Sequence, residues 1–174
     1  DVDPIESEKT EARIRAKGFG PDIWERRLMN FCEIDKLAAE AGPFDFVLAD
    51  LGVSSMQIDN PERGFTYKSD GPLDLRLNPE AGISAADRLR QLDYEELVGM
   101  MQENADEPYA EAIARQIVRA EKHRPIRTTR ELYAVIEVAL EKVHLPRDAA
   151  GKIPDRRDVI RKSSARVFQA LRID

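Results

Sequence analysis

The sequence predicts an α/β fold in which sheet elements within residues 1–55 precede a helical subdomain. Two apolar runs, from Trp24 to Phe31 and from Phe44 to Leu48, have the length and composition of buried strands. After residue 84 apolar side chains recur every three or four positions instead, which is the period of amphipathic helices. With 174 residues, of which 42% are apolar, the chain is large enough for one domain or parts of two.

The N-terminal elements have recognisable boundary residues. Pro4 opens a helix, because proline fits the first turn, and Gly18 and Gly20 end it. The first predicted strand follows, and a short helix around Leu37 connects it to the second strand. That second strand leads into Asp50.

The helices of the second part are predicted from their capping residues and apolar stripes. A Ser, Thr or Asp followed three residues later by an acidic residue predicts a helix start. The pairs that mark the predicted helix starts are Ser84 with Asp87, Asp93 with Glu96, and Thr128 with Glu131. From Tyr109 apolar pairs recur every four residues and leave Arg115, Arg119 and Lys122 outside the stripe. We therefore expect a compact helical subdomain inserted between sheet elements.

The stretch from Asp50 to Arg76 is the best candidate for a ligand site. It directly follows the second apolar run but is polar and rich in turn residues. In doubly wound α/β folds, ligands bind outside the carboxyl ends of the strands. Asp50 and Gln57 therefore offer an acceptor and an amide to a polar ligand. The alternative is that Asp50 only caps a following helix.

Charge is distributed unevenly along the chain. The net formal charge is −6, but residues 144–174 carry eight Lys or Arg against four Asp. This segment is therefore +4 and the remainder −10. Its basic residues lie among Pro and Gly, which predicts an exposed loop able to meet RNA phosphates. A solvated surface is the alternative interpretation.

Several classes of site are not indicated by the residues. Cys32 is the one cysteine, so no intramolecular disulfide forms, and a reducing cytoplasm suits the chain. Neither His123 nor His144 has a partner at metal-ligand spacing, so we predict no metal. No long apolar run or signal peptide is present, and we expect no membrane partner.

Several long motifs resemble those of one family. They are DLGVSS from Asp50, then Gln57 with Asp59, RGF, DGPLDLR, TTRELYAVI from Thr128, and FQALRI after Arg166. Together they are similar, in order and spacing, to the signature of the ribosomal RNA small-subunit methyltransferase H family. The resemblance implies a methyltransferase that uses S-adenosylmethionine to methylate the exocyclic N4 of a cytosine in small-subunit ribosomal RNA.

The resemblance also implies a fold and its divisions. We expect a partial Rossmann-like class I methyltransferase sheet with an inserted helical subdomain. Residues 1–78 would form part of the cofactor-binding domain, residues 79–162 the subdomain that recognises RNA, and residues 163–174 the return toward the first domain. The family's first strand with its glycine-rich turn is missing, as are the strands expected after Asp174. We therefore expect an interior, inactive fragment of a longer enzyme.

The resemblance assigns four cofactor contacts. Asp50 matches a cofactor-binding Asp and is also the candidate catalytic residue, although the catalytic residue itself stays unknown. Asp1 matches an acidic residue that accepts hydrogen bonds from ribose hydroxyls. Phe31 matches an aromatic residue beside the adenine. Gln57 matches a glutamine whose amide could hold the polar tail of the cofactor.

The candidates for RNA contact are two aromatic residues and three arginines. Phe65 or Tyr67 could stack on a base that has left its helix, although Phe65 could equally anchor its loop to the core. Arg156, Arg157 and Arg161 are the expected phosphate contacts. Two segments depart from the family's pattern, since its GEE is here residues 105–107 and its HPATR is here residues 162–166. These departures leave the RNA target open.

A second hypothesis is a non-enzymatic RNA-binding or protein-interaction module formed by the helical subdomain and the basic segment. The missing glycine-rich turn favours it. Asp50, Gln57 and the DGPLDLR run argue against it, because an interaction module has no evident need of them.

Overall fold

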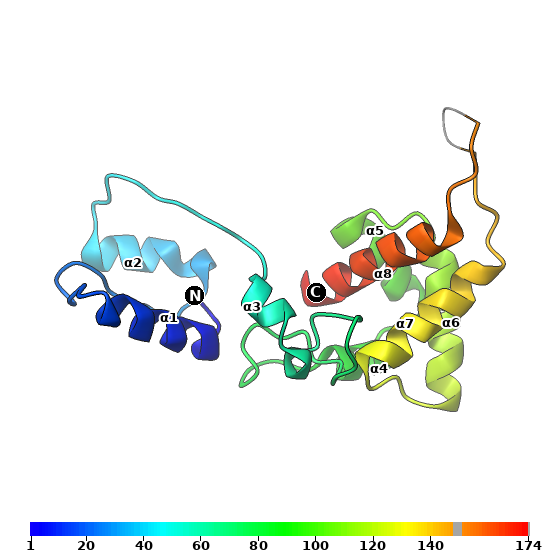
Figure 1. The fold of residues 1–174 in the computed structure, drawn as a ribbon, viewed down its shortest axis with the longest axis horizontal. Coiled ribbons are helices and arrows are strands. Elements are labelled where there is room, and N and C mark those ends of the chain that lie inside the picture. Colours follow the sequence, from blue (N-terminus) through cyan, green and yellow to red (C-terminus); the bar gives the residue numbers. More distant parts are fainter. Residues whose placement is uncertain (148–150, 174) are drawn as a thin grey trace. The chain divides into compact units, whose positions relative to one another are not determined.

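The computed structural model describes residues 1–147 and 151–173, and the chain forms two compact units (Figure 1). The first unit consists of Asp1–Ser54 and Leu77–Gly82. The second consists of Ser55–Arg76 and Ile83–Asp174.

The first unit contains two helices and a short 3₁₀ turn. Helix α1 spans Pro4–Ala16, the 3₁₀ helix η1 spans Phe31–Glu33, and α2 spans Ile34–Ala41. The buried carboxylate of Asp3 caps α1 by accepting from the amides of the second and third residues that follow it, at 2.9 and 3.1 Å. The predicted helices at Pro4 and around Leu37 are confirmed.

The two predicted strands are not formed within the part of the chain that the structure describes. Residues 24–28 and 44–50 have no regular secondary structure. In the second run Phe46 and Leu48 are each 78% exposed, and Val47 is 62% exposed. A buried strand requires paired neighbours and covered faces, and the second run lacks covered faces. The expected strands are therefore not confirmed within the described residues.

One pair of backbone hydrogen bonds retains the pattern of a parallel sheet. The backbone nitrogen of Asp1 donates to the Arg27 carbonyl at 3.2 Å, and the Met29 amide donates to the Asp1 carbonyl at 2.9 Å. Asp1 therefore bonds to Arg27 and Met29, the two residues on either side of Leu28. In a parallel pair of strands, each bonding residue contacts its partner strand in this way. The contact joins Asp1 to the segment that leads into Phe31.

The second unit is helical. Its elements are α3 Ser55–Ile58, η2 Pro61–Arg63, α4 Ala85–Gln91, α5 Tyr94–Ala105, α6 Ala110–His123, α7 Thr129–Glu141 and α8 Arg156–Ile173. Helices α5 to α8 form a closed group in which α5 packs on α6, α6 on α7, α7 on α8 and α8 on α5 (Figure 1). Helix α4 packs against α6.

The predicted capping residues begin these helices. Complete capping boxes join Asp93 to Glu96 at the start of α5 and Thr128 to Glu131 at the start of α7. At α4 the Ser84 hydroxyl accepts from the Asp87 amide at 3.2 Å. The apolar stripes face inward, and their fully buried centre includes Leu97, Met101, Ile113, Ile117, Leu132, Ile136 and Leu140.

Helix α8 corrects the expectation of an exposed basic loop. Residues 156–162, assigned to that loop, form the first two turns of a helix of 18 residues. Its N-terminus is fixed by Asp155, whose carboxylate accepts from the Arg157 amide at 2.8 Å. Its buried face carries Ile160, Val167 and Phe168, but Ser163 and Ser164 interrupt the apolar pattern. This interruption explains why the helix was not predicted.

The DGPLDLR segment, residues 70–76, is built into the second unit. Leu73 and Leu75 are 1% and 3% exposed and belong to its core. The carbonyls of Asp74 and Leu73 accept from the first two amides of α4, those of Ala85 and Ala86, at 2.8 and 2.9 Å. A helix leaves these first amides without internal partners, so the segment completes the start of α4.

The same segment completes the start of α7. The Thr129 amide donates to the Gly71 carbonyl at 3.0 Å, and the Arg130 amide donates to the Asp70 carboxylate at 3.3 Å. An isolated antiparallel bridge joins Pro72 to Thr128. The DGPLDLR run therefore has a structural use, which removes one argument made from sequence against a helical interaction module.

Two glycines allow the close approach on which this segment depends. Gly64 has φ +73°, and a Cβ there would lie 2.3 Å from the Pro72 carbonyl oxygen. At Gly71 a Cβ would lie 2.1 Å from the Pro61 carbonyl oxygen. Any side chain at either position would collide with backbone.

Candidate functional site

Asp1 and Phe31, two of the predicted cofactor contacts, line one pocket of about 280 Å³ in the first unit. They come together because the Asp1 backbone pairs with the segment before Phe31. Ile34 and Leu37, one helical turn apart on α2, supply apolar surface to the same pocket. The sequence reasoning missed these two residues, although their spacing directly after Phe31 was the available signal.

The chemistry of this pocket fits an adenosine group. One oxygen of the Asp1 carboxylate accepts from the Asp3 amide at 2.9 Å, which fixes the orientation of the carboxylate. Its second oxygen has no hydrogen-bond partner within residues 1–147 and 151–173. Phe31 is 67% exposed, so a face of its ring is open to a ligand. A carboxylate acceptor beside an open aromatic ring suits a ribose diol attached to a purine.

Asp50 lies in the exposed segment that follows α2. It is not among the residues that line the pocket of Asp1 and Phe31. Helix α3 begins at Ser55, so Asp50 is not the N-cap of the next helix, and that alternative is excluded. Its carboxylate accepts no hydrogen bond from the described residues and is open to solvent.

Gln57 lies in the second unit, on the single turn of α3. Only 6% of its surface is exposed. The structure therefore brings Asp1 and Phe31 together, and it places Gln57 in a different unit from Asp1, Phe31 and Asp50.

The two aromatic candidates for RNA contact pack within the second unit. The Arg63 guanidinium lies over the ring of Phe65, 5.6 Å from its centre. Tyr67 stacks on Tyr133 with ring centres 5.1 Å apart and meets the edge of Phe168 at 5.6 Å. Burial and the neighbouring Tyr133 raise the pKa of Tyr67, although the charge of Arg161 opposes this effect. One face of Tyr67 is therefore already occupied by protein.

The three predicted arginine contacts differ in their surroundings. The Arg156 guanidinium donates to the carbonyls of Leu140 and Val143, at the end of α7, the latter at 3.2 Å. It therefore caps a helix and is committed to the fold. Arg161 is exposed and pairs with Asp158 at 3.1 Å. Arg157 is exposed, and its side chain has no partner among the residues described.

No three His, Cys, Asp or Glu side chains within the described ranges are grouped so as to hold a metal ion. No helix in the described part of the chain is long and apolar enough to cross a membrane.

Comparison with known proteins identifies the class to which this chain belongs. The model of the MraW methylase family matches residues 2–174. The chain therefore belongs to the MraW methylase family, and the sequence resemblance is confirmed. Membership implies a class I methyltransferase fold, whereas the expected sheet is not formed within the described residues.

Curated relatives agree with this assignment. The chain is 58% identical to ribosomal RNA small subunit methyltransferase H 1 of Agathobacter rectalis, over 100% of the chain and 48% of that protein. It is 53% identical to the protein of the same name in Lachnoclostridium phytofermentans, over 100% of the chain and 46% of that protein. A more distant relative, ribosomal RNA small subunit methyltransferase H of Syntrophotalea carbinolica, is 38% identical over 94% of the chain and 48% of that protein. The chain spans about half the length of the curated relatives it matches.

Proposed function

We propose that the protein carrying this chain transfers a methyl group from S-adenosylmethionine to the exocyclic N4 of a cytosine in small-subunit ribosomal RNA. The observation that carries the proposal is the meeting of Asp1 and Phe31 in one pocket that suits adenosine. Membership of the MraW methylase family and the names of the relatives support methylation of small-subunit ribosomal RNA. An RNA substrate of this kind implies a cytoplasmic location.

The residues of the first unit take separate roles in this proposal. Asp1 accepts hydrogen bonds from the ribose hydroxyls, and Phe31, with Ile34 and Leu37, covers the adenine. The bound cofactor supplies an electrophilic methyl group. Gln57 is assigned to the polar tail of the cofactor.

Asp50 is the candidate for the chemical step. The N4 amine of cytosine is a weak nucleophile, because its lone pair is delocalised into the ring. An acceptor that bonds an amine hydrogen localises that pair on nitrogen. Asp50 is an exposed carboxylate with no partner among the described residues, so it is available to the amine or to the cofactor.

Residues 1–174 alone are proposed to be inactive. Within them no glycine-rich turn follows a strand, and the pocket of Asp1 and Phe31 serves only the adenosine half of the cofactor. The remaining contacts would come from elsewhere in the whole protein.

The identity of the product tests the proposed activity. The protein expressed from its whole reading frame is incubated with small-subunit ribosomal RNA and labelled S-adenosylmethionine, and the RNA is then digested to nucleosides. We expect the label in N4-methylcytidine. Label in a 5-methylcytidine or a methylated adenosine would refute the assignment of the target atom.

A non-enzymatic interaction module is the second candidate. The observation that favours it is that the second unit has its own core and uses the DGPLDLR segment to complete two helices. The reading frame upstream of Asp1 distinguishes the two functions. A strand followed by a glycine-rich turn supports the enzyme, and a native start near Asp1 supports the module.

A further inference from the structure

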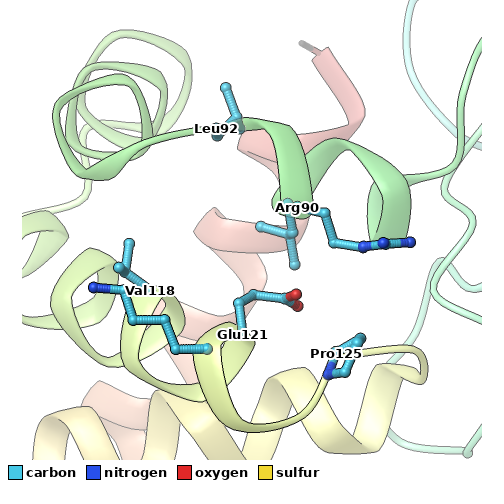
Figure 2. Close-up of a pocket in the computed structure, with 7 residues that line it drawn as sticks. Arg90, Leu92, Val118, Glu121 and Pro125 are labelled. Atoms are coloured by element: carbon cyan, nitrogen blue, oxygen red, sulfur yellow. The ribbon is translucent and has the colours of Figure 1, made fainter.

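A pocket of about 360 Å³ lies between the ends of α4 and α6, within the second unit (Figure 2). Its lining residues are Leu89, Arg90, Leu92, Val118, Glu121, Lys122 and Pro125. Leucine, valine and proline give it apolar walls, whereas Arg90 and Lys122 bring two cations. None of these residues belongs to the predicted cofactor site.

Four of the lining residues, from Val118 to Pro125, lie in a strongly basic segment of the chain. Residues 115–130 carry six Lys or Arg against one Glu, a formal charge of +5, so the remainder of the chain carries −11. Helix α8, from which RNA contact was predicted, carries the same formal charge, with six Lys or Arg against one Asp. The charge of residues 115–130 complements a polyanion.

Three cations of this segment are free of internal partners among the described residues, whereas Arg124 pairs with Glu131. Arg115, Arg119 and Lys122 are exposed, and none makes an ion pair or side-chain hydrogen bond with the described residues. They recur at helical spacing on α6 and so form one row, about 10 Å long. Lys122 both ends this row and lines the pocket. Arg156 and Arg161 of α8 are engaged, and Arg90 of the pocket lies 3.8 Å from the Asp87 carboxylate on its own helix.

Glu121 determines which part of a polyanion the pocket accepts. One of its carboxylate oxygens accepts from the Ile126 amide at 2.7 Å, which fixes the side chain. Figure 2 shows the carboxylate directed into the pocket, with Arg90 on one side and Pro125 on the other. A carboxylate repels a phosphate but accepts the N–H groups of a base edge. The pocket therefore favours a base inside and phosphates at its rim.

We infer that this pocket binds one unstacked nucleotide of an RNA strand. The base packs against Leu89, Leu92 and Val118 and donates to Glu121, while Arg90 and Lys122 bind its flanking phosphates. Arg115 and Arg119 continue the phosphate path along α6. The inference rests on the proposed function only in taking RNA as the partner.

RNA binding by the 174-residue chain, without S-adenosylmethionine, provides the test. Anisotropy of a fluorescein-labelled single-stranded RNA is titrated over a series of salt concentrations. The double variant Arg90→Gln with Lys122→Gln is compared with Arg157→Gln with Arg161→Gln, which removes the same charge from α8. We expect the first pair to lower the slope of log affinity against log salt by about 1.4 and the second to leave it unchanged. An equal loss in both pairs would overturn the inference.

A substitution that reduces the volume of the pocket without changing its charge tests whether a base enters it. Val118→Phe narrows the pocket, and we expect affinity to fall on the order of tenfold with no change in salt slope. If Val118→Phe changes neither the RNA affinity nor the unfolding temperature, then RNA contacts only the row of cations on α6. That result would overturn the nucleotide site. Displacement of the RNA by polyglutamate at equal charge would identify an acidic-peptide site instead and also overturn it.

Photocrosslinking keeps the inference testable if a variant fails to fold. An RNA containing 4-thiouridine is crosslinked to the wild-type chain, and the attached peptides are identified by mass spectrometry. We expect crosslinks within residues 89–92 and 118–125, and crosslinks confined to α8 would contradict the site. None of these assays measures methyl transfer. Loss of the proposed activity and loss of this binding site are therefore separate results.

Discussion

The carboxylate of Glu107 accepts a hydrogen bond from the hydroxyl of Ser163 at 2.9 Å, between positions 56 residues apart. Glu107 is 1% exposed, and the same carboxylate oxygen accepts from the Tyr109 amide at 3.0 Å. The Arg166 guanidinium lies 3.9 Å from the other oxygen. A buried carboxylate is costly unless it is bonded in this way. Glu107 therefore links α8 to the junction of α5 and α6.

The adjacent serines of α8 give a matched test of this contact. Ser163 and Ser164 are both fully buried, but the Ser164 hydroxyl has no hydrogen-bond partner in the described structure. We expect Ser163→Ala to lower the free energy of unfolding by about 1–3 kcal/mol, because it removes a donor from a buried carboxylate. Ser164→Ala should be neutral or slightly stabilising. Denaturant unfolding measures both, and equal losses would show that the hydrogen bond contributes nothing specific.

Gly71→Ala should destabilise the second unit. A Cβ at Gly71 would lie 2.1 Å from a backbone oxygen, so the segment that completes α4 and α7 must shift. We expect a loss of about 1–3 kcal/mol in the free energy of unfolding. Gly99, inside α5, is the control, because a Cβ there meets nothing within 4 Å. Gly99→Ala should gain about 0.5–1 kcal/mol, so the two substitutions should shift the thermal midpoint in opposite directions.

Asp74 should contribute a pH-dependent part of the stability. Partial burial raises the pKa of its carboxyl, but hydrogen bonds and charge from Arg76, whose guanidinium lies 2.7 Å away, outweigh burial and leave the pKa lowered. A lowered pKa in the folded state stabilises the fold above the unfolded-state pKa, about 3.9, and this contribution disappears as the pH falls through the folded-state pKa.

The variant Asp74→Asn isolates this contribution. The difference in unfolding free energy between the wild type and the variant should be constant above about pH 5 and shrink as the pH falls below about 4. A difference that stays the same down to pH 2 would show that the carboxylate charge is not involved.

The sequence predicted the helices that begin with local signals. The capping boxes at Asp93 and Thr128 are formed because each involves residues only three positions apart. The inward stripes of α6 and α7 follow from the same short-range periodicity. The family resemblance assigned Asp1 and Phe31 to the cofactor one at a time. It did not predict that their segments pair and line one pocket.

The sequence did not predict the features that depend on contacts between residues far apart in the chain. Helix α8 contains Ser163 in its buried face, and that serine is explained only by Glu107, far away in the sequence. The two apolar runs before Asp50 have strand composition, but a strand forms only with a neighbouring strand that composition does not supply. The capping role of Arg156 likewise depends on carbonyls of α7, so its charge alone suggested an RNA contact.

The 174-residue polypeptide should bind S-adenosylmethionine more weakly than the micromolar range. Its first unit offers Asp1, Phe31 and apolar surface to the adenosine end, but its sequence has no glycine-rich turn for the methionine end. A site that lacks buried partners loses affinity steeply. Isothermal titration calorimetry measures this directly, and a micromolar dissociation constant would refute it.

Methyl transfer by Asp50→Ala is the most direct test of the account. The substitution is made in the protein expressed from its whole reading frame, and Asp45→Ala, which removes another exposed aspartate of the same segment, serves as the control. Because Asp50 is exposed and makes no contact that stabilises the described structure, its loss should leave the unfolding temperature unchanged. We predict that Asp50→Ala abolishes methylation of small-subunit ribosomal RNA while Asp45→Ala retains it. Full activity in Asp50→Ala would contradict the proposed site.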